Sequence, residues 1–184
     1  MTENQQTLQI ISGISGELSK QPDVFMGFSL TNQDLEAMLA DGISLAKNKV
    51  KGIAVDPQLN VQIEADEIRV RGSVGVDYPM MGHSSVNVES VVISNTEPKG
   101  GLWVKEAKFS KHLSPQVQVA AAVGNVDIDN EIGSRLKDPY KSLYETIGKE
   151  MWQQGVQLGQ LTFNIEDGQV VIGISGRPIP PQGR

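Results

Sequence analysis

Cysteine is absent from all 184 residues. This absence excludes disulfides, thiolate catalysis and cysteine-ligated metals together. Histidine is scarce as well, and His83 and His112 are expected on separate loops without the paired spacing of metal ligands. The sequence therefore predicts no metal site and no cofactor.

Motifs that would identify a catalytic site are also missing. The chain has no GxSxG nucleophile elbow, no GxxxxGK[ST] phosphate loop and no GxGxxG after a strand. The run Asp127–Glu131 resembles the start of a calcium loop, but Ile132 stands where that loop needs glycine. Acids at a helix start are the simpler interpretation. We expect no catalytic residue, and hence no enzyme.

Blocks of positive charge and long apolar runs are lacking too. Sixteen Lys and Arg residues against 22 Asp and Glu give a net charge of −6, which argues against nucleic acid as a partner. Lys47, Lys49 and Lys51 are interpreted as a solvated strand edge, with a weak lipid head-group contact as the alternative. No apolar run reaches the ~18 residues of a spanning helix, so we expect at most peripheral membrane contact. The N-terminus lacks a signal-peptide pattern, which predicts a cytoplasmic protein if Met1 is the natural start.

What the sequence does contain predicts one domain with two poorly anchored ends. Residues 1–27 are expected to be a loosely ordered leading segment, because Gly13 and Gly16 interrupt a short apolar pattern and Pro22 ends it. Residues 28–176 are expected to form a single α+β domain, and residues 177–184 a Pro-rich tail.

Alternating apolar residues predict antiparallel strands. A hairpin is expected over 59–76, with its turn near 65–67 and a break in phase at Gly72. A strand follows over 86–93, with a slip in phase between Val88 and Val91. Before these strands, residues 28–30 read as a short strand. Thr31 and Asp34 then form a capping box for a helix that Asp41–Gly42 would end.

The segment around which the chain is organised runs from 139 to 174. Apolar residues at three- and four-residue spacing predict an amphipathic helix over 139–158, and alternation over 161–174 predicts a hairpin turning at Asp167–Gly168. The expected fold class is α+β, with a curved antiparallel sheet packed on this long C-terminal amphipathic helix.

Two features of the sequence suggest a binding surface. Glycines inside the predicted helix cost about 1 kcal/mol each, so either close packing or a groove for an acyl chain or partner helix should offset them. Paired methionines between Pro79 and Gly82 would either fold back on the core or form an adaptable contact for lipid or protein. The candidate ligand-binding residues are Tyr144, Gly148, Met151, Gly155, Leu158, Met80 and Met81.

The order of elements resembles a known family. The Leu30–Leu35 segment opening a helix, then long alternating strands, an amphipathic helix and the closing Ile165–Ile172 hairpin are similar to bacterial tubular lipid-binding (TULIP-like) proteins, including LmeA-like phospholipid-binding proteins. The resemblance covers residues 28–176 and supplies no site residues. It implies a curved sheet around a helix, with a groove for lipid.

We therefore expect a non-enzymatic binding protein for a lipid or another hydrophobic small molecule, held between sheet and helix. The alternative is a structural protein that joins a protein partner or its own copies through strand edges and the Met80–Met81 loop.

One internal similarity in the sequence has two interpretations. Residues 61–72 and 163–176 share an apolar-x-Ile-Glu strand and an acidic turn, which indicates either a pseudo-repeat or a common hairpin pattern.

Overall fold

The computed structural model describes residues 3–45, 53–78, 82–95, 101–113, 134–135, 137–166 and 168–180. Its helices are α1 (Glu3–Lys20), α2 (Asn32–Ser44) and α5 (Pro139–Gln153). Its strands are β1 (Met26–Leu30), β2 (Ala54–Ile63), β3 (Glu67–Tyr78), β4 (Gly82–Asn95), β5 (Gly101–Leu113), β6 (Val156–Glu166) and β7 (Gln169–Pro178).

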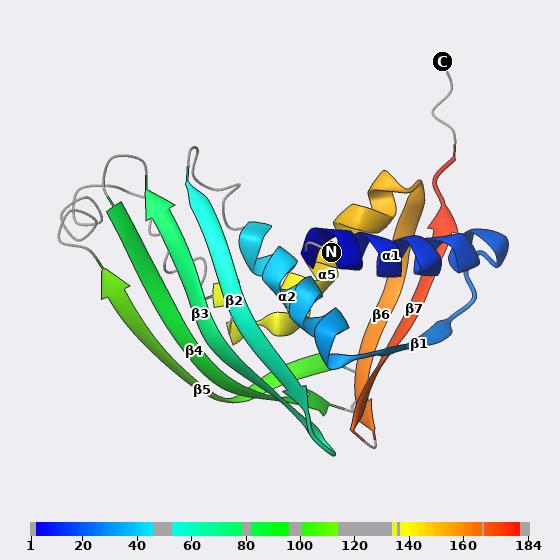
Figure 1. Ribbon diagram of the computed structural model, residues 1–184. Coiled ribbons are helices and arrows are strands. Elements are labelled where there is room, and N and C mark those ends of the chain that lie inside the picture. The colour runs from blue at the N-terminus through cyan, green and yellow to red at the C-terminus, as the bar shows by residue number, and fades with distance from the viewer. Residues whose placement is uncertain are drawn as a thin grey trace.

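The strands form two antiparallel sheets that together make a curved wall. One sheet has the order β1-β7-β6 and the other β2-β3-β4-β5. Figure 1 shows the sheets converging at the lower edge of the view and splaying apart above it, with the helices between them. Hydrogen bonds between described residues link the sheets where they converge. The Gly168 amide donates to the Ala65 carbonyl at 3.3 Å, and the Ile165 amide donates to Ser94 Oγ at 3.3 Å. The predicted α+β class with a curved antiparallel sheet is confirmed.

The predicted length of the C-terminal helix is wrong. Helix α5 ends at Gln153, and Gly155 follows with φ of 76° before β6 begins at Val156. Glycine adopts this left-handed conformation without the steric penalty of a Cβ atom, so it ends the helix. Gly155 and Leu158 consequently lie outside the helix, and α5 is a short helix followed by a hairpin.

Helix α2 begins as predicted and ends later. Thr31 Oγ1 accepts a hydrogen bond from the Asp34 amide at 3.2 Å, and the Asp34 carboxylate accepts one from the Thr31 amide at 2.9 Å. This capping box is confirmed. The predicted stop at Asp41–Gly42 is wrong, because Gly42 is a buried packing position: a Cβ placed on it would lie 3.0 Å from the Ser142 carbonyl oxygen of α5.

The capping box gives the protein an acid-sensitive contribution to stability. Burial of the Asp34 carboxylate opposes its ionisation, but hydrogen bonds from the Thr31 backbone and the Gln6 and Thr31 side chains outweigh burial and lower the pKa of Asp34. A lowered folded-state pKa stabilises the fold above the unfolded value and loses this effect as the pH falls through the folded value. We expect Asp34→Asn to cost about 1 kcal/mol at pH 7 and less at low pH. Urea unfolding across pH 2–7 would measure this difference, and a pH-independent difference would contradict it.

The first helix corrects the expectation of a loosely ordered leading segment. Residues 3–20 form α1, in which Ile11, Ile14 and Leu18 are at most 2% exposed and belong to the hydrophobic core. Gly13 and Gly16 lie on the exposed side, where a Cβ would meet no atom within 4 Å. The two glycines separate the apolar residues along the sequence, but they do not lie on the buried face of the helix. The single-domain assignment of residues 28–176 stays a prediction.

The inward-facing positions of β3 and β4 differ from the expected phase. On β3 the buried positions continue evenly through Gly72, so the predicted break in phase is wrong. On β4 buried positions alternate without a break at Ser84, Val86, Val88, Ser90 and Val92, and Val91 points outward, so the expected slip within this strand is also wrong. The register does shift between Val91 and Val92 in the pairing with β5. A serine at a buried position concealed the true alternation.

Side chains cap backbone groups along two edge strands, β2 and β6. The Val61 amide donates to the Glu36 carboxylate at 3.1 Å, and the Ile63 amide donates to Asn32 Oδ1 at 3.2 Å. Tyr140 donates its hydroxyl hydrogen to the Leu161 carbonyl at 3.1 Å. Unpaired edge groups are the usual template for strand addition. At these positions β2 and β6 offer none, while assembly through other edges or the Met80–Met81 loop stays a prediction.

Candidate functional site

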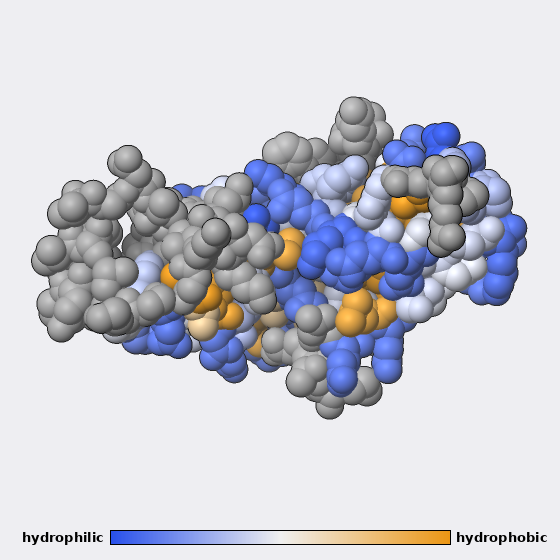
Figure 2. Space-filling view, turned by 90° about the horizontal axis from the view of Figure 1, so that it is seen from above, coloured by the Kyte–Doolittle hydropathy of each residue, from blue (hydrophilic) through white to orange (hydrophobic). Residues whose placement is uncertain are grey.

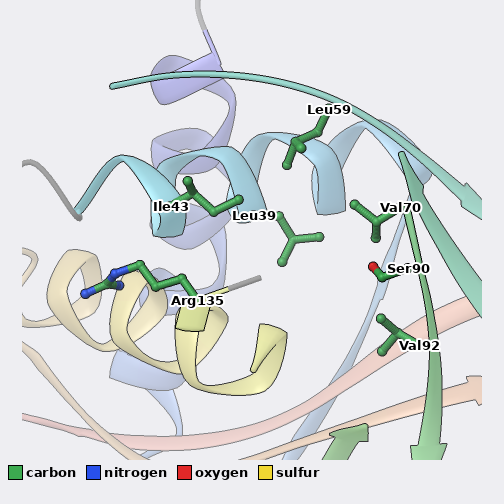
Figure 3. A pocket seen from close by; sticks show the side chains of 7 residues that line it. All are labelled: Leu39, Ile43, Leu59, Val70, Ser90, Val92 and Arg135. Atoms are coloured by element: carbon green, nitrogen blue, oxygen red, sulfur yellow. The ribbon is translucent and has the colours of Figure 1, made fainter. Parts of the chain in front are cut away.

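A small apolar pocket lies between α2 and the four-stranded sheet. Figure 3 shows its side chains converging from α2, from three strands and from the segment before α5. The lining residues are Leu39, Ile43, Leu59, Val70, Ser90, Val92 and Arg135. The cavity volume is about 10 Å³, which is close to the space that one water molecule needs.

The strand geometry explains why these residues meet. Val70 and Ser90 are register partners on β3 and β4, and Val61 is the partner of Val70 on β2. Because side chains alternate across a sheet, these positions share the face that α2 covers. Leu39 and Ile43 are four residues apart in α2, so they lie on one side of that helix and point toward the sheet.

Arg135 provides positive charge at one end of the pocket. Its side chain is 10% exposed and donates from Nη1 to the Gly42 carbonyl at 3.0 Å and to the Glu145 carboxylate at 2.8 Å. In Figure 3 its aliphatic stem lies beside the pocket, while the guanidinium points away from Val70 and Ser90. Arg135 thus bridges the C-terminal end of α2 and helix α5.

The contact between α2 and α5 closes this end of the pocket. Gly42 faces Ser142 and Thr146 so closely that a Cβ atom would lie 3.0 Å from Thr146 Oγ1. The two hydroxyls bond within their own segment, Thr146 to the Ser142 carbonyl at 2.9 Å and Ser142 to the Arg135 carbonyl at 3.0 Å. At Gly42, the two helices are therefore joined by small residues and by Arg135.

The ligand-binding residues predicted from sequence lie elsewhere. Met151 is fully buried in the core, and Tyr144 is 41% exposed and stacks on Tyr140. A Cβ on Gly148 would lie 3.5 Å from Leu158, so these two positions are packed together. Gly155 stands in the turn after α5. Met80 and Met81 lie outside the described residues, and ligand contact at all these positions stays a prediction.

Sequence reasoning missed the residues that line the pocket. The one available signal was Ser90, which falls on the buried phase between Val88 and Val92. Nothing in the sequence indicated a role for Arg135. Its partner Gly42 is distant in sequence, and its partner Glu145 is not at a spacing that predicts a contact within a helix.

The histidines are in strands rather than on separate loops. His83 on β4 is the register partner of Asp77 on β3, and His83 Nδ1 lies 2.8 Å from Asp77 Oδ1. His112 on β5 pairs with Ser85, which shares the outer face with His83. Both members of the Asp77–His83 pair are more than half exposed. Within the described part of the chain, no group of three His, Asp or Glu side chains is arranged to hold a metal ion.

The surface carries separate hydrophobic residues. Figure 2 shows small hydrophobic groups divided by hydrophilic ones on this face. Among the described residues, the exposed large hydrophobic side chains are those of Leu8, Val24, Phe25, Tyr144 and Trp152. Of the helices that the structure describes, none has the length and apolar character required to cross a membrane.

Comparison with known proteins places the chain in no family. No family model and no curated protein matches it. Among solved structures, it is similar to the crystal structure of a lipopolysaccharide binding protein, with 16% sequence identity and a TM-score of 0.22. The match covers 84% of this chain and 41% of the length of that chain. The similarity to TULIP-like proteins therefore stays a prediction.

Proposed function

We propose that this protein binds an apolar small molecule or lipid chain, without catalysis, in the pocket between α2 and the four-stranded sheet. The observation that carries the proposal is the lining: five aliphatic side chains surround the cavity, with the Ser90 hydroxyl and Arg135 as its polar groups. Predominantly apolar linings with few polar groups are typical of small-molecule sites.

The pocket must widen before it can accept a chain. A cavity of about 10 Å³ holds no more than about one water molecule. We take the α2–α5 contact as the place that opens, because the Arg135 side chain that bridges it is held by hydrogen bonds to the Gly42 carbonyl and to the partly exposed Glu145 carboxylate. Opening this contact would leave the paired core strands intact.

Binding is tested with purified, detergent-free protein and twelve-carbon ligands below their micelle concentrations. Native mass spectrometry shows any ligand that co-purifies, and thermal unfolding with dodecanol or dodecanoate measures stabilisation by binding. We expect a Tm that rises with ligand concentration. No co-purified ligand and no change in Tm with either compound would refute the proposal.

Two serines on β4 provide a matched pair of variants. Ser90→Val adds methyl groups inside the pocket, whereas Ser85→Val adds them on the opposite face of the same strand. We expect Ser90→Val to weaken binding about tenfold by filling the cavity, and Ser85→Val to leave binding unchanged. Equal effects of both variants would place the ligand elsewhere.

A further inference from the structure

The guanidinium of Arg135 stands where the pocket's aliphatic lining ends. Its stem contributes to the lining, and its charged end lies next to the Gly42 carbonyl and the Glu145 carboxylate. Leu39 and Ile43 lie on the same side, and the pocket continues from them toward Val70 and Val92. One end of the pocket therefore carries the Arg135–Glu145 ion pair, and the other is hydrocarbon.

A ligand that matches both ends is an amphiphile with one anionic group. Guanidinium groups bind carboxylates and phosphates through charge-assisted hydrogen bonds. Among the described residues that line the pocket, Arg135 is the one cation, so a ligand with a single negative group at one end of its hydrocarbon chain matches it. A neutral amphiphile would gain the apolar contacts but not these bonds.

Glu145 currently occupies the position that such an anion would take. Its carboxylate accepts from Arg135 Nη1 at 2.8 Å, and its side chain is 36% exposed. Because it reaches solvent, Glu145 can leave Arg135 and become hydrated when another anion arrives. The exchange would keep Arg135 paired throughout, which matters because its side chain is nearly buried.

On the basis of the pocket function proposed above, we infer that Arg135 selects an anionic amphiphile by exchanging Glu145 for the ligand's carboxylate or phosphate group. The exchange also breaks the bridge that Arg135 forms between the Gly42 carbonyl of α2 and Glu145 of α5. Binding of the ligand's head group therefore also loosens the α2–α5 contact, through which the hydrocarbon chain of the ligand enters.

The test compares dodecanoate, dodecyl phosphate and dodecanol on the full-length protein, with acetate and inorganic phosphate as head-group-only probes. We expect wild type to bind both anionic chains several-fold more tightly than dodecanol, which is less than the roughly tenfold effect of a whole charge-assisted hydrogen bond because the ligand's bond replaces that of Glu145. Acetate and inorganic phosphate should not raise the Tm. Stabilisation by either of these small anions at similar concentrations would overturn the inference, since the site would then take free anions.

Three variants identify the residue responsible. Arg135→Gln should abolish the preference for anionic chains, while Lys141→Gln, which removes the same charge from an exposed position on α5, should retain it. Glu145→Gln should bind dodecanoate several-fold more tightly, because the competing carboxylate is gone. This last variant keeps Arg135 and remains informative if Arg135→Gln fails to fold.

The outcomes separate this inference from the function on which it rests. Equal binding of dodecanoate and dodecanol, or an anion preference that Arg135→Gln retains, would overturn the role of Arg135 and leave the apolar pocket standing. Unchanged dodecanoate affinity in Glu145→Gln would overturn the exchange. If none of the twelve-carbon compounds binds, the proposed function fails, and the inference fails with it.

Discussion

Replacing Gly72 with alanine is expected to destabilise the protein by about 3 kcal/mol or more. A Cβ atom on Gly72 would lie 2.0 Å from the Gln58 carbonyl oxygen and 2.9 Å from the Leu59 Cα atom, both of them backbone atoms of β2. Gly72 also has φ of 147°, which side chains rarely allow. Relief would require β2 and β3 to separate where Leu59 pairs with Gly72.

Gly75 on the same strand is the matched control. A Cβ there would meet the end of the exposed His83 ring at 3.0 Å, and this ring can turn away into solvent. We expect Gly75→Ala to change the free energy of unfolding by less than about 1 kcal/mol. Urea unfolding of both variants measures the contrast, and a Gly72→Ala protein as stable as wild type would contradict the assigned strand geometry.

The hairpins were predictable because the pattern that specifies each of them lies within one short stretch of sequence. Alternation with period two, together with turn residues near Ala65 and at Gly168, predicts β2–β3 and β6–β7. The capping box of Thr31 and Asp34 was readable for the same reason, since its two hydrogen bonds lie within one helical turn.

The helix ends were less predictable because glycine has two opposite roles. Gly42 continues α2 and provides close contact with α5, whereas Gly155 ends α5 through its left-handed backbone. Sequence spacing alone cannot separate these roles, because the first depends on a helix that lies about one hundred residues away. The predictions for these two glycines were consequently reversed.

The pocket could not be predicted because its parts come from separate segments. Leu39, Ser90 and Arg135 meet only after β2–β3–β4 have paired and α2 has covered them. The methionines and tyrosines that were predicted to bind a ligand are chemically distinctive, yet Met151 lies in the hydrophobic core.

The pseudo-repeat stays open. Ile63 and Ile165 occupy equivalent strand positions and the amide of each is capped, but Asn32 of α2 caps the first and Ser94 of β4 the second.

Phe163→Ala is expected to destabilise the protein by about 3–5 kcal/mol, the usual range for a buried phenylalanine. Phe163 on β6 is fully buried, and its ring meets that of Tyr140 on α5 edge to face, with 5.8 Å between centroids. The variant loses both the buried area and the contact that orients α5 on the β1-β7-β6 sheet. Urea unfolding with Phe25→Ala as the control measures this. Phe25 is 50% exposed, so its loss should cost about 1 kcal/mol.

The same variant separates an artificial cavity from the proposed pocket. Removing a buried ring leaves a dry apolar space of the kind that binds benzene, so Phe163→Ala is expected to gain affinity for benzene. That cavity would lie between α5 and β6, and Phe163 does not line the pocket behind α2. Dodecanoate binding by Phe163→Ala should therefore keep its dependence on Arg135. If Phe163→Ala instead lost dodecanoate binding while still folded, the chain would bind along α5 and β6, near the face of Tyr144 and Leu158 predicted from sequence.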